Sequence, residues 1–388
     1  MGSSDQTAMN RILNLLDDNS FVEIGAKVTK RNTDFNLEGK EIPADGVITG
    51  YGLIDGSMVY VYSQDATALG GAIGEMHAKK IVKIYELAMK IGVPVIGLID
   101  CAGLRLQEAT DALNAFGSLY ASKVMASGVI PQITAVFGNC GGGVAVANAL
   151  GDFTFMEDEA KVFVSSPNVL EGNYVEKLDT AASEFQAECG NVDFVEKKED
   201  IYNQIRQLVT ILPSNNEDDD SYEECTDDLN RVSSVFEGEV KDPRTALTDI
   251  SDNGFFMEVK KAYAQEMVTG FIRLNGMTVG AVANASALLD AEGKEVATYE
   301  KVLTTAGCEK AAHFVNVCDA FNIPVLTLTN VSGFAATMCA ERSLAKAAAK
   351  LTYAFANATV PKVNVVIGKA FGSAYVTMNS KSLGADMV

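Results

Sequence analysis

The sequence predicts an α/β fold built from two tandem domains, and two observations carry this prediction. The same unit occurs twice at a constant offset of 230 residues, shared by four landmark pairs: Pro94 and Pro324, Gly103 and Gly333, Pro131 and Pro361, and Gly138 and Gly368. Four landmarks in one register indicate a duplicated domain. In each copy, continuous runs of Val, Ile and Leu alternate with helical patterns, which is typical of a parallel sheet buried on both faces.

The first copy begins with a helix and a hairpin and continues as alternating helices and strands. Apolar residues spaced three and four apart predict a helix at 9–20. Alternating strands flank the turn Asp55-Gly56, which predicts a hairpin. The remaining elements alternate between helices and buried strands: a helix at 75–91, a strand at 93–99, a helix at 107–126, a strand at 132–137 and a helix that begins at the glycine triplet Gly141–Gly143.

The second copy repeats this order. A strand pair at 268–284 has its own turn, Asn275-Gly276. The elements expected after it are a helix at 307–321, a strand at 323–329, a helix at 340–357, a strand at 363–367 and a helix from about residue 373. The last residues enter a new strand, so we expect the second domain to be incomplete at its C-terminus.

The domain boundary is predicted near Pro213, where the composition changes. Eight acidic residues fall within 217–228, and such a charge run is more typical of a solvated linker than of a specific acidic tail. We assign residues 1–212 to an N-terminal domain, 213–245 to an acidic linker and 246–388 to a C-terminal domain.

Composition excludes several classes of function. The net charge of −20 argues against a nucleic-acid partner. The N-terminus lacks the pattern of a signal peptide, and no apolar run approaches the roughly 20 residues of a membrane span. The seven cysteines are scattered and odd in number, which favours reduced thiols and a cytoplasmic location. They include no Cys-x-x-Cys pair, so we expect no zinc ribbon and no metal site.

The feature of the sequence that points to catalysis is a turn rich in small residues, which occurs in both copies. Gly141, Gly142 and Gly143 stand where a strand meets a helix, and the first helical amides lack internal partners. Such amides can stabilise an oxyanion, a contribution worth roughly 3–4 kcal/mol per donor. Tight packing of helix on strand is the alternative explanation. The second turn, 369–375, offers the amides of Ser373 and Ala374 in the same way.

Four further candidate residues each have a structural explanation as well as a functional one. Arg105 follows the strand at 93–99 and could bind a ligand phosphate at the sheet edge, or pair with Glu108 at helical spacing. His77 opens a helix and could contact the ligand or hydrogen-bond at the helix start. Cys101 and Cys140 lie beside the predicted site, but without an adjacent histidine we expect them to pack rather than act as nucleophiles.

Seven ordered stretches resemble the carboxyltransferase component of biotin-dependent acyl-CoA enzymes: 70–80, 127–133, 212–216, 268–271, 282–284, 318–324 and 382–386. This family includes β subunits of acyl-CoA carboxylases and α subunits of methylmalonyl-CoA and glutaconyl-CoA decarboxylases. The resemblance implies two tandem crotonase-like (ClpP/crotonase) domains. It also implies a homo-oligomer, either a dimer or a trimer of dimers, in which the N-terminal domain of one subunit faces the C-terminal domain of another.

The resemblance also implies the reaction and its site. A carboxyl group would move between biotin on a carrier protein and a short acyl-CoA, through enolates held in two backbone oxyanion holes. The implied catalytic residues are Gly142, Gly143, Ser373 and Ala374. The implied acyl-CoA-binding residues are Gly103, Leu104, Arg105, Gly141 and His77. The implied biotin-binding residues are Gly333, Phe334, Gly372 and Val376. A biotin carboxylase or a membrane decarboxylase subunit is a further possible partner.

The sequence departs from the family mainly in the second copy. Ser373 replaces the usual second glycine, Val376 replaces an acidic residue, and 331–341 lacks the usual Pro-Gly-Phe pattern. Two other interpretations therefore stay open. One is a crotonase-like acyl-CoA hydratase or isomerase, for which Glu108 is the nearby candidate base. The other is a non-catalytic assembly subunit of a carboxylase complex.

Overall fold

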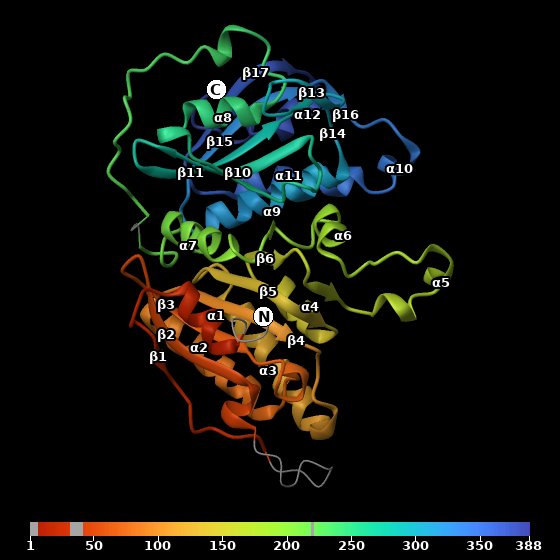
Figure 1. Ribbon diagram of the computed structural model, residues 1–388. Coiled ribbons are helices and arrows are strands. Elements are labelled where there is room, and N and C mark those ends of the chain that lie inside the picture. The colour runs from red at the N-terminus through yellow and green to blue at the C-terminus, as the bar shows by residue number, and fades with distance from the viewer. Residues whose placement is uncertain (1–6, 32–41, 219–220) are drawn as a thin grey trace. The chain divides into compact units, whose positions relative to one another are not determined.

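The computed structural model describes residues 7–31, 42–218 and 221–388 of the chain, which divides into two compact units, Met1–Asp218 and Asp219–Val388 (Figure 1). We call them the N-terminal unit and the C-terminal unit. Among the described residues, none of the helices has the length and apolar character needed to cross a membrane.

The N-terminal unit is built on one mixed sheet. Its strands are β1 (Val22–Glu23), β2 (Val47–Ile54), β3 (Ser57–Gln64), β4 (Val95–Cys101), β5 (Gln132–Gly141), β6 (Phe153–Glu157), β7 (Lys161–Phe163) and β8 (Phe194–Glu196). They pair in the order β1-β2-β3-β4-β5-β6-β8, and β7 pairs with the end of β5. The hairpin β2–β3 is antiparallel, whereas β3, β4, β5 and β6 run parallel.

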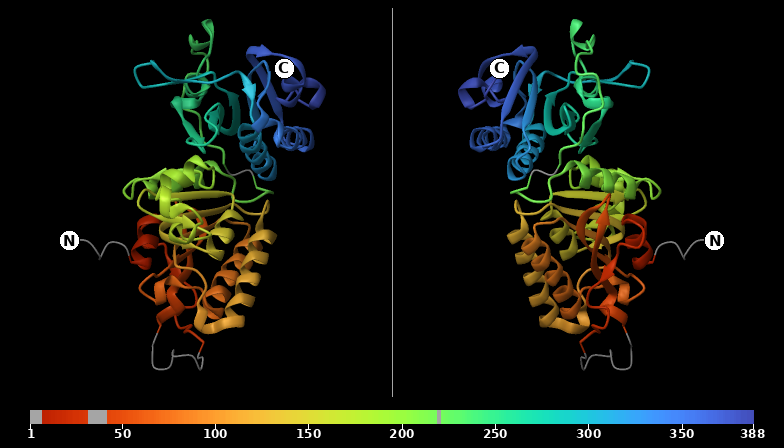
Figure 2. Two further views of the ribbon diagram at one scale, coloured as in Figure 1. Left: turned by 90° about the vertical axis from the view of Figure 1, so that its right-hand side faces the viewer. Right: turned by 90° about the vertical axis from the view of Figure 1, so that its left-hand side faces the viewer.

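Helices complete the N-terminal unit: α1 (Ala8–Leu15), α2 (Glu75–Ile91), α3 (Ala109–Ala126), α4 (Gly143–Ala149), α5 (Asn173–Glu176), α6 (Ser183–Glu188) and α7 (Ile201–Ile211). The longest two, α2 and α3, lie side by side (Figure 2). Helix α2 ends at Ile91 and is followed by the cap residue Gly92, whose left-handed conformation suits glycine. The apolar faces of these helices and the buried strands β4 and β5 form one hydrophobic core.

The C-terminal unit repeats the plan. Its strands are β9 (Phe256–Val259), β10 (Met267–Leu274), β11 (Met277–Asn284), β12 (Ala287–Leu289), β13 (Glu295–Thr298), β14 (Val302–Leu303), β15 (Val325–Val331), β16 (Gly333–Phe334) and β17 (Lys362–Ala370). Its helices are α8 (Pro243–Ile250), α9 (Thr305–Ala320), α10 (Met338–Glu341), α11 (Leu344–Asn357) and α12 (Gly372–Thr377). The main sheet has the order β17-β15-β11-β10-β9.

As in the N-terminal unit, an antiparallel hairpin comes first along the chain and is followed by strands that pair in parallel. Strands β10 and β11 are antiparallel, and β11, β15 and β17 are parallel. Helices α9 and α11 pack against one another, as α2 and α3 do in the first copy. The predicted duplication is therefore present as two similar sheet-and-helix units.

Some predicted boundaries were wrong. The helix expected at 9–20 ends at Leu15, because the Asp17 carboxylate accepts the amides of Asp55 and Gly56 and ties the chain to the β2–β3 turn. The helix expected at 340–357 is two helices, α10 and α11, that are separated at residues 342–343. Helix α8 begins at Pro243, inside the stretch predicted to be linker.

Candidate functional site

The first glycine turn joins β5 to α4. Gly142 has φ of 61° and ψ of −128°, a conformation that strongly favours glycine. At Gly143, a Cβ atom would lie 2.9 Å from the Tyr120 hydroxyl and 3.0 Å from the Phe116 ring. The backbone conformation therefore requires glycine at position 142, and the lack of space for a side chain requires glycine at position 143.

Hydrogen bonds hold this turn in place. The amide of Gly142 donates to the carbonyl of Phe163 at 2.9 Å. The Tyr120 hydroxyl donates to the carbonyl of Gly143 at 2.7 Å. The first amides of a helix have no intrahelical acceptors. The Gly142 amide is thus used within the chain, and the amide of Gly143 at the start of α4 is the donor that suits a ligand oxygen.

The loop after β4 meets this turn. Gly103 has φ of 124°, and a Cβ added to it would lie 3.3 Å from the carbonyl oxygen of Gly141. Its amide donates to the Cys101 sulfur at 3.3 Å. Leu104 is half-buried and bridges to Ile73. The structure therefore brings together four of the predicted residues, Gly103, Gly141, Gly142 and Gly143.

Arg105 lies nearby in sequence, but its side chain has no exposed surface. The guanidinium pairs with Asp45 at 2.5 Å and with Glu108 at 2.9 Å. A buried guanidinium needs such partners, because unpaired burial of a charge is costly. Burial raises the pKa of Asp45 even though Arg105 opposes this shift. This geometry favours the ion-pair alternative for Arg105 over a direct ligand contact.

His77 is also fully buried. Its amide donates to the Asp45 carboxylate at 2.7 Å, Nδ1 lies 3.0 Å from the Asp45 carbonyl oxygen, and Nε2 lies 3.2 Å from the Gln64 side-chain nitrogen. Burial lowers the pKa of His77 to about 3, and nearby Arg105 contributes, so the imidazole is neutral at physiological pH. The hydrogen-bonding role at the start of α2 accounts for these contacts.

The two cysteines beside the turn have no exposed surface. Burial raises the pKa of Cys101 to about 12 and raises that of Cys140 as well. A thiol that stays protonated is a poor nucleophile. Both side chains therefore serve packing.

The second turn has a similar backbone. Gly372 has φ of 62°, close to the 61° of Gly142 found 230 positions earlier. The short helix α12 begins there and carries Ser373, which is exposed, and Ala374, which is buried. A Cβ added to Gly372 would meet no atom within 4 Å, as is also the case at Gly142.

The residues predicted to bind biotin gather around this turn. Gly333 and Phe334 form β16, which pairs with β14 and contacts α12. Val376 lies on α12 and is 40% exposed. Together with Gly372, these residues lie in one region of the C-terminal unit.

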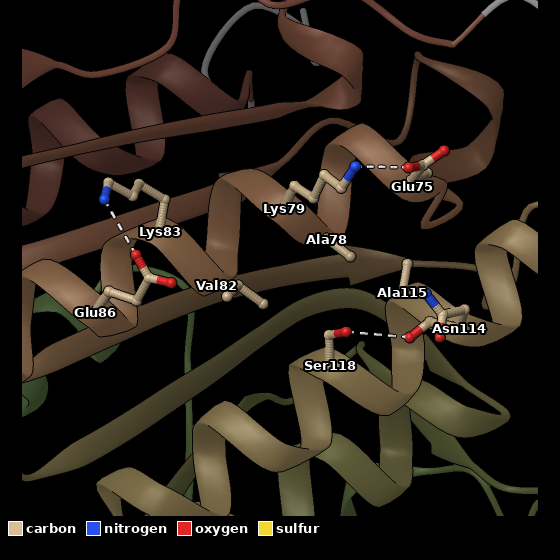
Figure 3. A pocket seen from close by; sticks show the side chains of 9 residues that line it. All are labelled: Glu75, Ala78, Lys79, Val82, Lys83, Glu86, Asn114, Ala115 and Ser118. Atoms are coloured by element: carbon tan, nitrogen blue, oxygen red, sulfur yellow. Dashed lines mark hydrogen bonds and ion pairs between the residues drawn. The ribbon is translucent and has the colours of Figure 1, made fainter.

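A separate groove of about 210 Å³ lies between α2 and α3 (Figure 3). It contains none of the predicted site residues, and its charged walls are paired internally, Lys79 with Glu75 and Lys83 with Glu86. A groove of about 550 Å³ occupies the corresponding place between α9 and α11. We assign no chemistry to either groove.

Sequence reasoning missed two residues that support the site. Tyr120 holds the carbonyl of Gly143, and Asp45 binds both Arg105 and His77. Asp45 lies 60 positions before Arg105. No local pattern connects residues so far apart, so only the folded chain reveals these contacts.

The chain is similar to known proteins of one family over almost its whole length. A model of the carboxyl transferase domain family matches residues 3–388. The chain is 39% identical to the methylmalonyl-CoA decarboxylase subunit alpha of Propionigenium modestum, over 100% of this chain and 75% of the relative. It is 40% identical to the propionyl-CoA carboxylase beta chain of Roseobacter denitrificans, over 99% of this chain and 76% of the relative.

Among solved structures, the chain is similar to a transcarboxylase 12S hexamer with methylmalonyl-CoA and methylmalonic acid bound. The TM-score is 0.90 at 37% identity, covering 98% of this chain and 75% of that chain. The predicted α/β architecture of two crotonase-like domains is confirmed by this similarity.

Proposed function

Because this chain belongs to the carboxyl transferase domain family, we propose that it is the subunit that moves a carboxyl group between biotin and a short acyl-CoA. The observation that carries this proposal is the duplicated turn. Gly142 and Gly372 have nearly the same φ, 61° and 62°, and each stands at the start of a helix. Two such turns can steady negative charge on two different substrates.

In the N-terminal unit, we assign the first turn to the acyl-CoA. The amide of Gly143 would donate to the thioester oxygen, while Gly103 and Gly141 leave room for close approach. The Gly142 carbonyl shares a peptide plane with that amide and accepts the amide of Ala145 at 3.1 Å, which fixes the direction of the Gly143 amide before substrate binds. The bond from Gly142 to Phe163 and the bond from Tyr120 to Gly143 hold the flanking peptides. Preorganised donors stabilise developing charge without further rearrangement.

In the C-terminal unit, we assign the second turn to biotin carried by a partner protein. Biotin supplies a ureido group that accepts and releases the carboxyl. Residues 371–373 are exposed, which fits a group that arrives from solvent, and the amides of Ser373 and Ala374 would donate to its oxygen. Gly333, Phe334 and Val376 would line the approach.

The side chains near the first turn do not favour hydratase or isomerase chemistry. That chemistry needs a carboxylate that is free to exchange protons with the substrate. The Glu108 carboxylate is buried and bound by Arg105 at 2.9 Å and by the amide of Glu75 at 2.6 Å. His77 is buried and neutral. A mechanism based on backbone donors suits these surroundings better.

The physiological setting completes the proposal. We propose that the chain acts as a homo-oligomer, a dimer or a trimer of dimers, with a biotin carboxyl carrier protein as its partner. A biotin carboxylase or a membrane decarboxylase subunit would complete the enzyme, depending on the direction of the reaction. All seven cysteines are free, which supports a cytoplasmic location.

The decisive experiment measures exchange of labelled carboxylate between methylmalonyl-CoA or malonyl-CoA and free biotin. The wild type should catalyse it, and Gly143→Val should lower the rate by about a hundredfold or more, since the branched side chain would collide with Tyr120 and Phe116. Gly117→Val is the matched control, because a Cβ added to this glycine of α3 would meet no atom within 4 Å.

Three results would contradict this assignment. Full activity of Gly143→Val would remove the first turn from the mechanism. Acyl-CoA binding without any carboxyl transfer by the wild type would favour the non-catalytic assembly subunit. Equal losses in Gly143→Val and Gly117→Val would point to a general effect of valine on folding.

A further inference from the structure

The strands that lead into the two turns share an irregularity. In the N-terminal unit, Ile99 pairs with Val136 but Cys101 pairs with Cys140, so residues 137–139 bulge opposite Asp100. In the C-terminal unit, Thr329 pairs with Val366 and Val331 pairs with Ala370. Residues 367–369 therefore bulge opposite Asn330 in the same way. The two bulges are related by the same 230-residue offset as the turns.

In each bulge one side chain replaces a missing backbone partner. The Asp100 carboxylate accepts the amide of Asn139 at 3.3 Å. The Asn330 side-chain oxygen accepts the amide of Lys369 at 2.9 Å. A bulge takes its residues out of the ladder, so their amides need another acceptor. Asp100 and Asn330 supply that acceptor from the neighbouring strand.

A glycine makes this contact possible in both copies. A Cβ added to Gly138 would lie 2.2 Å from the Asp100 carboxylate oxygen, and one added to Gly368 would lie 2.5 Å from the Asn330 side-chain oxygen. Neither distance is sterically possible without a shift. Gly138 and Gly368 are therefore explained by the need to admit the acceptor.

The bulges end directly before the turns. The ladder resumes at Cys140 and Ala370, two residues before Gly142 and Gly372. The contact in each bulge therefore orients the end of its strand. Because the helix follows directly, the same contact also orients the first helical amides. We propose that Asp100 and Asn330 are positioning residues, the first for the acyl-CoA turn and the second for the biotin turn. This inference rests on the proposed function.

The two copies differ in charge. Asp100 is paired with Arg11 of α1 at 2.8 Å, and the Arg11 side chain is only 4% exposed. Asn330 is neutral and buried, and its backbone amide donates to the Asn284 side chain at 3.1 Å. The Asp100 side chain is 14% exposed, and a mostly buried carboxylate needs a counter-ion, whereas a buried amide does not. The same acceptor geometry is thus obtained with and without charge.

The test compares Asp100→Ala and Asn330→Ala in the carboxyl-exchange assay with free biotin, with kcat and KM measured for each substrate. Misplacement of a catalytic group by about 1 Å can cost about a hundredfold. We expect Asp100→Ala to lower kcat/KM for acyl-CoA by about ten- to hundredfold while the KM for biotin stays within about twofold. Asn330→Ala should show the reverse pattern.

A double-mutant cycle separates positioning from general destabilisation. Gly138→Ala alone should show the same acyl-CoA defect, because its methyl group would displace the Asp100 carboxylate. In the Asp100→Ala background the clashing atoms are gone, so Gly138→Ala should add little. Asp100→Asn keeps an acceptor oxygen and should recover most of the activity, although Arg11 loses its ion pair.

The outcomes distinguish this inference from the proposed function. If both variants raise both KM values equally, or if they change neither kcat nor either KM, the positioning role is wrong and the contacts serve only the fold. If the wild type transfers no carboxyl group, the proposed function fails. Acyl-CoA affinity of the wild type and Asp100→Ala, measured by calorimetry, then still tests the first positioning role, and equal affinities would overturn it.

Discussion

At the scale of single residues, both units contain a buried lysine at the same position of the repeat. The Lys80 ammonium donates to the carbonyl of Ala44 at 2.9 Å and also to that of Val47. Lys310, 230 positions later, donates to the carbonyl of Tyr263 at 2.7 Å. Burial lowers the pKa of Lys80 to about 8 and that of Lys310 to about 7. Each lysine thus fixes the chain that leads into its hairpin.

The lowered pKa of Lys310 predicts a pH-dependent stability. The folded-state pKa is about 7, against an ordinary value of 10.5, so protonation of the folded protein costs stability. The penalty is fully present below pH 7 and is relieved as the pH rises toward 10.5. The unfolding free energy of the wild type should therefore rise, relative to Lys310→Met, between about pH 7 and pH 10.

Denaturant unfolding of both proteins at several pH values checks this prediction. The difference between the two proteins isolates Lys310 from the other groups that titrate in this range. Glu258 and Glu266 act to raise this pKa, and Arg244 and Lys260 act to lower it. A difference that stays constant with pH would mean that Lys310 titrates at its ordinary value.

At the scale of elements, the Arg105 cluster joins three segments around the first turn. Asp45 lies in a 3₁₀ turn at Pro43–Gly46, and Glu108 lies in another at Leu106–Glu108. The second Glu108 oxygen accepts the amide of Glu75 at the start of α2, at 2.6 Å. The buried guanidinium lies between these carboxylates, so it holds the segments together.

We predict that Arg105→Met lowers the free energy of unfolding by about 3–5 kcal/mol, because it leaves Asp45 and Glu108 buried without a counter-charge. The KM for acyl-CoA of the folded fraction should change by less than about threefold, since a fully buried side chain makes no direct contact with ligand. Unfolding curves and steady-state kinetics of the same preparation measure both quantities.

Arg31→Met is the matched control for this prediction. Arg31 also pairs with two carboxylates, Glu75 and Asp111, but its side chain is 45% exposed. Exposed pairs contribute little to stability, so the unfolding curve should hardly move. A stable Arg105→Met with a tenfold higher KM would instead support the direct substrate contact that the sequence suggested.

At the scale of the whole molecule, the two units have separate hydrophobic cores. Phe155 is fully buried in the N-terminal unit and stacks on Phe194 with ring centres 4.4 Å apart. Phe271 is fully buried in the C-terminal unit, 5.1 Å from the Phe314 ring. A core that is complete within its own unit can unfold as a separate cooperative step.

We therefore expect two calorimetric transitions that respond to different substitutions. Phe155→Ala and Phe271→Ala should each destabilise one unit by about 3–5 kcal/mol. Each variant should shift one transition and leave the other within about 2 °C. Equal shifts of a single transition in both variants would show that the two units unfold as one.

The duplication, the two hairpins and the glycine turns are encoded locally in the sequence. These features depend on local rules: an Asp-Gly or Asn-Gly turn, a buried apolar strand, and a glycine where φ is positive. The sequence also predicted the two-domain α/β fold and the carboxyltransferase family. The family resemblance placed Gly103 and Gly141 in one binding site, and the fold brings these two residues together.

Which groups around those turns are free and which are bound depends on long-range packing. It buried Arg105 against Asp45, 60 positions away, and joined Gly142 to Phe163 and Asp100 to Asn139. These partners come from different strands and turns, so no spacing within one segment encodes them. Burial determines which groups are available for chemistry. A charged or polar group that is removed from water must pair with whichever groups the fold brings near it.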